Sequence, residues 1–294
     1  MIITKMLTIA ARSKNPLVVN RLGYGAMRLT GEGSYGEPVN RAEALEILKQ
    51  TTNNSINFID TADYYGEDVT NRLIVEALYP YTDNLVICTK VGAARKPDKS
   101  WISFATPKNI RTSVENNLRT LKQNQIQLVH FRVMPGVTKT SYKASMETMF
   151  TLQQEGKILH VGVSNVTTDQ LSTALKMGEI ATVENMFGYA QRNNLTTVPN
   201  EYIGSADILE MCVHHQIPFI PYYSLIGSLP EKDSRISIIA NKYSASAAQI
   251  NIAWLLHYSP IILPIPGTSS LIHFTENVAA ASINLTMEDM EFLK

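Results

Sequence analysis

The chain has 294 residues, of which 45% are hydrophobic, so it can bury a large core. Its 26 Lys and Arg residues balance 26 Asp and Glu residues, which excludes a diffuse electrostatic binder of nucleic acid or of an anionic membrane. Two cysteines, Cys88 and Cys212, are too few for a disulfide framework or a cysteine-rich metal site. Prolines and polar residues interrupt the most apolar region, residues 247–266, so we expect a cytoplasmic protein without a membrane-spanning helix.

Short β-rich segments alternate with helical patterns along the whole chain. Most of these segments are nearly continuous in apolar residues, which is typical of parallel strands covered on both faces. They are residues 22–27, 56–59, 85–90, 126–133, 158–163, 181–183, 218–223 and 261–265. Eight such units predict an α/β fold of the (β/α)₈ TIM-barrel type, with an open doubly wound sheet as the alternative. We expect one domain over residues 1–294, in which residues 1–20 form an N-terminal extension or hairpin.

Several of the helices carry recognisable start signals. Asn40 with Glu43 resembles a capping pair, and Thr106-Pro107 resembles an N-cap followed by a proline in the first turn. Ser141 is expected to open the next helix, which Gly156 ends. Further helices are expected over residues 168–178, 205–214 and 286–294 and after residue 246.

Residues 31–36 (GEGSYG) match the dinucleotide-binding pattern G-x-G-x-x-G letter for letter. That pattern binds a pyrophosphate only when a strand precedes it and a helix follows it directly. Here Pro38 follows, and the next helix is expected only near Asn40. We therefore interpret residues 31–36 as a loop after the first strand.

Polar residues stand at the ends of three expected strands. Asp60 and Tyr65 follow the second strand, Lys90 ends the third, and the fourth carries His130 and Arg132. The C-terminal ends of barrel strands meet at one rim, so these side chains should share one site. A nearby ammonium lowers the pKa of a tyrosine, which is ordinarily about 10. A tyrosine tuned in this way can donate a proton to a carbonyl oxygen as a hydride reaches the carbon.

Motifs along the chain resemble those of the aldo-keto reductases. They are residues 58–66 (FIDTADYYG), Thr89-Lys90, residues 161–165 (VGVSN) and residues 263–268 (LPIPGT) followed by Glu276-Asn277. The resemblance runs from about residue 21 to residue 294, and it implies a (β/α)₈ barrel that binds NADPH rather than NADH across its C-terminal face. Residues 20–28, 70–81, 131–134 and 266–271 further resemble the bacterial branch of the family that includes pyridoxal reductase.

The resemblance also implies roles for individual residues. Tyr65 matches the catalytic acid, Asp60 its support and Lys90 the partner that lowers its pKa. Ser164 and Asn165 match residues that bind the nicotinamide carboxamide, and Tyr222 matches the aromatic side chain that stacks on the nicotinamide ring. Two further matches concern the adenosine end of the cofactor: Thr268, Ser269 and Ser270 for the 2′-phosphate, and Asn277 for adenine.

Three positions depart from the family pattern. The spacing that usually gives the catalytic His leads to Arg132, with His130 as the alternative on the same strand face. An Arg at this position can polarise a carbonyl or pair with an anionic oxygen beside it, such as the phenolate of pyridoxal. Glu184 stands where the family usually has Gln, and as a carboxylate it can only accept hydrogen bonds from the cofactor. His273 stands where many relatives place an Arg against the 2′-phosphate.

These observations predict an NADP-dependent oxidoreductase that reduces an aldehyde or ketone to an alcohol, with pyridoxal as a candidate substrate. A redox-sensing accessory subunit with negligible turnover and a barrel with unrelated chemistry are the alternatives. We expect a small-molecule carbonyl substrate, no nucleic-acid or membrane partner and no metal ion, because the six His residues do not fall at ligand spacings. Residues 30–39, 92–105 and 192–202 should determine the substrate, and the sequence leaves the oligomeric state open.

Overall fold

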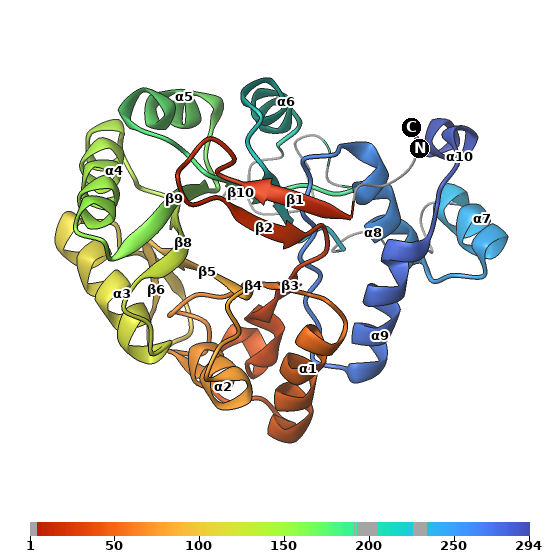
Figure 1. Ribbon diagram of the computed structural model, residues 1–294, viewed down its shortest axis with the longest axis horizontal. Coiled ribbons are helices and arrows are strands. Elements are labelled where there is room, and N and C mark those ends of the chain that lie inside the picture. Colours follow the sequence, from red (N-terminus) through yellow and green to blue (C-terminus); the bar gives the residue numbers. More distant parts are fainter. Residues whose placement is uncertain (1–4, 191, 193–204, 226–233) are drawn as a thin grey trace.

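A curled sheet of parallel strands forms the centre of the computed structural model, which describes residues 5–190, 192, 205–225 and 234–294 (Figure 1). The strand order is β11-β10-β9-β8-β5-β4-β3, so the sheet follows the order of the chain; only a small antiparallel hairpin, β6 (Ala93–Arg95) with β7 (Trp101–Ser103), is inserted between β5 and β8. The strands are β3 (Tyr24–Gly25), β4 (Phe58–Asp60), β5 (Val86–Val91), β8 (Ile126–Arg132), β9 (Ile158–Ser164), β10 (Val183–Met186) and β11 (Phe219–Tyr222).

The eighth expected strand, residues 261–265, closes the barrel without forming a regular strand. On one side, Phe219 N donates to Ile261 O and Leu263 N donates to Phe219 O, both at 2.9 Å; on the other, Gly23 N donates to Pro264 O at 2.9 Å. Because proline has no N–H, Pro264 accepts a hydrogen bond from Gly23 but cannot donate one to the ladder. The (β/α)₈ prediction is therefore confirmed and the open-sheet alternative is wrong, but the segment was too irregular for the strand that we expected.

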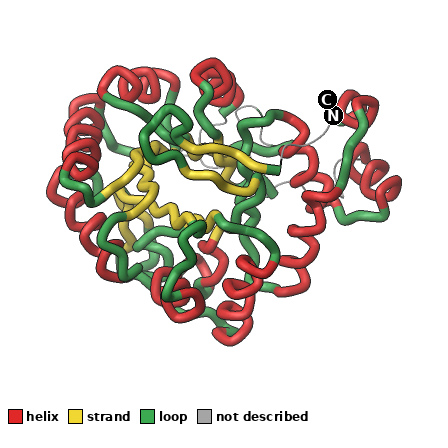
Figure 2. The backbone as a smooth tube through the Cα atoms, viewed as in Figure 1, coloured by secondary structure: helices red, strands yellow, loops and turns green. Residues whose placement is uncertain are grey.

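Helices surround the sheet on its outer face (Figure 2). Side chains of Asn40, Thr106 and Ser246 cap α1, α3 and α8 as predicted. The predicted start of α4 at Ser141 was wrong, because Thr138 is the N-cap and Ser141, as the third helical residue, completes a reciprocal capping box. The helices are α1 (Arg41–Asn53), α2 (Val69–Leu78), α3 (Pro107–Thr120), α4 (Lys139–Gln154), α5 (Thr168–Met177), α6 (Ala206–His215), α7 (Ser234–Tyr243), α8 (Ala247–Tyr258), α9 (Leu271–Ala279) and α10 (Met287–Phe292).

An antiparallel hairpin, β1 (Met6–Ile9) with β2 (Leu17–Asn20), crosses one end of the barrel (Figure 1). Ile9 and Val19 are fully buried there in one cluster with Phe58, Leu128 and Ile220 from the barrel strands. This apolar plug closes the N-terminal end of the barrel, so access to the barrel interior is left to the opposite end.

The side chains inside the barrel change from apolar to polar toward the C-terminal ends of the strands. Alternate residues of a strand face the same side, so Leu128, His130 and Arg132 follow one another inward along β8. On β5, Cys88 precedes Lys90 in the same way, and Lys90 is paired with His130 in the sheet register. The titratable groups are therefore concentrated at the rim that the hairpin does not cover.

Residues 31–36 lie in the loop between β3 and α1, part of which is the short 3₁₀ turn η2 (Glu32–Ser34). The segment has no strand directly before it and no helix directly after it, which agrees with its interpretation as a loop. Within the described part of the chain, no helix is both long and apolar enough to cross a bilayer.

Candidate active site

A cleft with about 890 Å³ of empty space, including its open mouth, lies at the C-terminal rim of the barrel. Strand ends and the loops after them line it, which is where barrel enzymes place their chemistry. Its lining comprises Gly25, Met27, Arg28, Asp60, Tyr64, Tyr65, Trp101, Arg132, Met134, Glu184, Tyr222, Tyr223, Ser224, Leu225, Ile265, Pro266 and Gly267.

The ammonium of Lys90 lies beneath this cleft between two buried carboxylates. Its Nζ atom contacts both carboxylate oxygens of Asp60 and lies 3.3 Å from Oε1 of Glu184. Burial by itself lowers the pKa of Lys90, but these two carboxylates raise it well above its ordinary value. Lys90 is therefore a fixed cation, and β4, β5 and β10 hold it in place.

Tyr65 lies directly above this ion pair, in the loop between β4 and α2. The Nζ atom of Lys90 is 5.3 Å from the centroid of the Tyr65 ring. We predicted a lowered pKa for Tyr65, and this is wrong for the free protein: burial raises the pKa more strongly than Lys90 lowers it, and Asp60 and Glu184 also raise it. Tyr65 is consequently a protonated phenol at neutral pH, which is the form that a proton donor requires.

His130 is completely buried one layer below the cleft. Its Nε2 atom is 2.6 Å from the hydroxyl of Thr182, and its Nδ1 atom is 3.1 Å from Oε2 of Glu184. Gly162 makes room for the ring, because a Cβ at that position would collide with His130. Burial lowers the pKa of His130, so we expect a neutral imidazole that positions Glu184.

Arg132, the next inward residue of β8, lines the cleft itself. Its guanidinium lies 5.0 Å from the ring centroid of Tyr222, and Nη1 donates a long hydrogen bond of 3.4 Å to Oγ of Ser164. Of the two alternatives on this strand, Arg132 is thus the one that a ligand in the cleft can touch.

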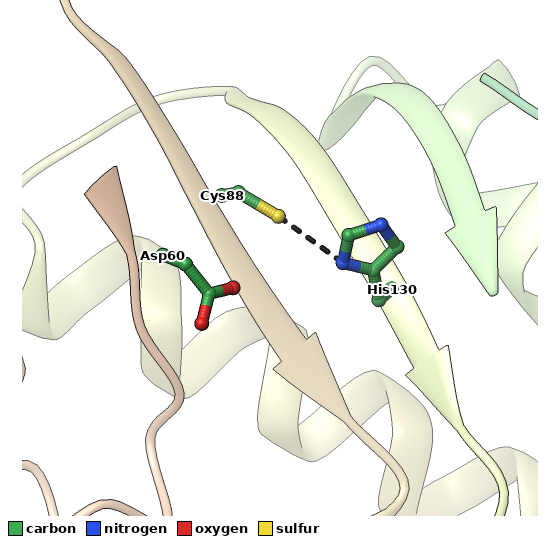
Figure 3. Close-up of side chains that lie close together, drawn as sticks. All are labelled: Asp60, Cys88 and His130. Atoms are coloured by element: carbon green, nitrogen blue, oxygen red, sulfur yellow. Dashed lines mark hydrogen bonds between the residues drawn. The ribbon is translucent and has the colours of Figure 1, made fainter. Parts of the chain in front are cut away.

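Asp60, Cys88 and His130 place three potential metal-ligating atoms within 4.8 Å of one another (Figure 3). The Sγ atom of Cys88 is 3.2 Å from Nδ1 of His130. However, Lys90 already balances the Asp60 carboxylate, and burial raises the pKa of the Cys88 thiol well above its ordinary value. The protonated thiol is a poor ligand, so this cluster is better suited to hydrogen bonding than to metal binding.

The residues expected around the nicotinamide form a connected group on the β9 and β11 side of the cleft. The Tyr222 hydroxyl donates to Oδ1 of Asn165 at 2.9 Å, and Nδ2 of Asn165 donates to Val133 O at 2.9 Å. Ser164 lies directly before Asn165 and accepts from Arg132. These contacts orient the ring of Tyr222 as one wall of the cleft.

The residues expected at the adenosine end gather separately around the start of α9. Ser270 is the N-cap of this helix, and its backbone N–H donates to Oγ1 of Thr268 at 3.0 Å. Ser269 and His273 are exposed, while Asn277 is buried on the helix. The pocket residue Gly267 directly precedes this group along the chain, which joins it to the cleft.

A carboxylate that we did not predict also lies at the start of α9. Oε1 of Glu43, from α1, accepts a hydrogen bond of 2.9 Å from the backbone N–H of Leu271. These two residues are 228 positions apart. No sequence pattern links them, and the contact could be found only from the fold.

Most of the other cleft residues were not predicted as site residues, among them Arg28, Tyr64, Trp101 and Met134. Arg28 and Tyr64 stand inside motifs that carry the family resemblance, so their position beside functional residues was an available signal. Trp101 lies in one of the loops expected to determine the substrate, residues 92–105. Most of another such loop, residues 193–202, lies outside the described residues.

Comparison with known proteins supplies an independent observation. The sequence model of the Aldo/keto reductase family matches residues 21–294. The chain is 39% identical over 279 residues to the pyridoxine 4-dehydrogenase of Escherichia coli (strain K12), and the match covers 94% of each protein. It is 38% identical over 274 residues to an uncharacterized oxidoreductase of Schizosaccharomyces pombe, with 92% of this chain and 85% of that protein covered.

Solved structures share the fold over nearly the whole chain. An aldo/keto reductase from Klebsiella pneumoniae, crystallised in complex with NADP and acetate, matches with a TM-score of 0.76 and 24% identity, covering 99% of this chain and 94% of that one. A thermostable aldo-keto reductase in complex with the inhibitor epalrestat matches with a TM-score of 0.79 and 22% identity, covering 99% and 98%.

Proposed function

The chain belongs to the aldo/keto reductase family, as its motifs predicted, and from this premise we propose that it reduces an aldehyde to an alcohol with NADPH. The observation that carries the proposal is the convergence of Tyr65, Lys90 and Asp60 at one cleft. Tyr65 donates the proton to the carbonyl oxygen, Lys90 supports the phenolate that remains, and Asp60 fixes Lys90. Arg132 lines the same cleft, where its guanidinium can pair with an oxygen of the substrate.

Pyridoxal, reduced to pyridoxine, is the substrate that we propose to test first. The similar Escherichia coli protein is named for the oxidation of pyridoxine at carbon 4, and the reduction of pyridoxal is that reaction in reverse. The cationic side chain of Arg132 suits the phenolate oxygen beside the aldehyde of pyridoxal.

The cofactor residues are also a proposal. When bound, NADPH supplies the hydride. The ring of Tyr222 offers a stacking face, Ser164, Asn165 and Glu184 offer polar groups beside it, and the start of α9 offers an N-terminal helix dipole for a phosphate. The exposed guanidinium of Arg28, also at the cleft, adds a cation for the cofactor phosphates. Asn277 on α9 is proposed for adenine, and His273 for the 2′-phosphate.

The deciding assay follows NADPH oxidation with pyridoxal beside a panel of simple aldehydes and ketones. We expect turnover with pyridoxal and a kcat/KM at least about tenfold above that of benzaldehyde, because polar groups of the site pair with the substituents of pyridoxal. Tight NADPH binding with negligible oxidation across the panel would instead support a redox-sensing subunit, and no binding would support unrelated chemistry.

A prediction on cofactor choice follows from Glu43. Its carboxylate already satisfies a backbone N–H at the start of α9, where the 2′-phosphate of NADPH is proposed to bind. Glu43→Gln keeps an oxygen that can accept this hydrogen bond but removes the negative charge. The Kd for NADPH should fall about three- to tenfold, which corresponds to about 1 kcal/mol, while the Kd for NADH changes little.

Fluorescence titration of both cofactors measures this effect. Glu46→Gln is the matched control, because Glu46 lies on the same helix and contacts Gln50 rather than α9. Equal changes for NADPH and NADH in Glu43→Gln would place the 2′-phosphate elsewhere.

A further inference from the structure

Tyr64, which directly precedes Tyr65, carries a buried hydroxyl without a hydrogen-bond partner among the described residues. The side chain lines the cleft, and the residue is only 5% exposed. Its ring meets Tyr65 edge-on with centroids 5.3 Å apart and meets Trp101 edge-on at 5.5 Å. The two neighbours hold the phenol in place, so its hydroxyl is presented at a fixed position.

An unpartnered buried hydroxyl is costly, by about 1–3 kcal/mol, unless a ligand pairs with it. Tyr142 also has an unpaired hydroxyl, but it lies in the core against Phe131 and is not a cleft residue. The position of Tyr64 in the cleft therefore indicates a polar group of the bound substrate as its partner.

The guanidinium of Arg132 has unused donors in the same cleft. A guanidinium has five N–H groups, and within the described chain Arg132 makes a single long hydrogen bond, to Ser164. No carboxylate of the described residues lies within ion-pair distance of it, whereas Asp60 and Glu184 both face Lys90. Arg132 is thus a cation of the cleft that no carboxylate of the described residues neutralises by direct contact.

We propose that Tyr64 and Arg132 together bind an ionised oxygen on the carbon next to the one that carries the aldehyde. This inference rests on the proposed function, because it takes the carbonyl oxygen to lie at Tyr65. Tyr64 adjoins Tyr65 in the chain and touches its ring, so the oxygen bound by Tyr64 lies beside the carbonyl. The substrate class is accordingly aromatic aldehydes with a hydroxyl ortho to the aldehyde group, and Tyr64 determines the preference for them.

Matched aldehydes and one variant test this assignment. The wild type and Tyr64→Phe are assayed with 2-hydroxybenzaldehyde, 4-hydroxybenzaldehyde, 2-methoxybenzaldehyde and benzaldehyde, all with NADPH. We expect Tyr64→Phe to lower kcat/KM for the 2-hydroxy compound by about 10- to 100-fold, as for the loss of a hydrogen bond to a charged group. Values for the other three aldehydes should change by less than about twofold. Comparing variant with wild type on each aldehyde cancels the intrinsic reactivity of that aldehyde.

Each outcome bears on a different claim. If the wild type reduces these aldehydes but Tyr64→Phe lowers kcat/KM for all of them alike, Tyr64 merely supports Tyr65 and the inference is overturned while the proposed function stands. An unchanged profile in Tyr64→Phe overturns the inference in the same way. If the wild type reduces none of the aldehydes, nor pyridoxal, the proposed function itself fails and the inference with it. Tyr142→Phe, which removes an unpaired hydroxyl away from the cleft, is the control and should match the wild type.

Discussion

Replacing Tyr65 by phenylalanine is expected to lower kcat for aldehyde reduction by about 10²- to 10⁴-fold, the usual contribution of a positioned proton donor. Burial keeps the pKa of Tyr65 raised, so the wild-type side chain holds its proton at neutral pH and can transfer it to the carbonyl oxygen. Phenylalanine keeps the ring that packs edge-on against Tyr64 and lies over Lys90. The substitution should therefore remove the donor and leave the shape of the cleft unchanged.

Two measurements separate the loss of chemistry from a loss of cofactor binding. Single-turnover NADPH oxidation reports the chemical step, and fluorescence titration reports the Kd for NADPH, which should stay within about twofold of the wild-type value. The control is again Tyr142→Phe, which deletes a tyrosine hydroxyl in the core. A Tyr65→Phe enzyme with nearly wild-type kcat would show that another group donates the proton.

The sequence was sufficient to predict the alternation of strands and helices and the approach of Asp60, Tyr65 and Lys90. Buried parallel strands are recognisable as short apolar runs, and the rule that barrel chemistry lies at the C-terminal strand ends then brings distant residues together. The sequence also left two candidates, His130 and Arg132, for the β8 side chain that faces the cleft. Only their burial in the structure distinguishes Arg132, which lines the cleft, from His130 beneath it.

Other features depend on tertiary structure and could not be read from the sequence. Residues 261–265 looked like a strand because their composition is apolar, but their role in closing the barrel depends on hydrogen bonds to Gly23 and Phe219. The sign of the pKa shift of Tyr65 depends on how fully the phenol is desolvated, and the separate sequence motifs that contain Tyr65 and Lys90 do not reveal this burial. The unpaired hydroxyl of Tyr64 likewise appears only when every neighbouring donor and acceptor is placed.

Replacing Lys90 by methionine is expected to move the pH dependence of alcohol oxidation toward higher pH. In that direction Tyr65 must act as a base, so the rate rises with pH as the phenol ionises and levels off above its pKa. Lys90 lowers this pKa, and among the charged groups around Tyr65 it has a larger influence than Asp60 or Glu184, which raise the pKa. Removing the ammonium therefore raises the pKa of Tyr65 further, and the rising limb shifts to higher pH. In the direction of reduction, the weaker acid should lower kcat at neutral pH.

Methionine at this position also leaves Asp60 and Glu184 buried without their shared cation, and breaking such a pair can cost about 3–5 kcal/mol of stability. The double variant Asp60→Asn, Lys90→Met separates this loss of stability from the effect on Tyr65, because it removes one charge of each sign and keeps side chains of similar size. We expect it to recover much of the thermal stability lost in Lys90→Met but to keep the displaced pH–rate profile, since the larger influence of Lys90 on Tyr65 is still missing. A profile that returns to the wild-type position in the double variant, or that never moves in Lys90→Met, would assign Lys90 to folding alone. The contributions of Lys90 to stability and to proton transfer can thus be separated, because thermal unfolding reports the first contribution and the pH–rate profile reports proton transfer.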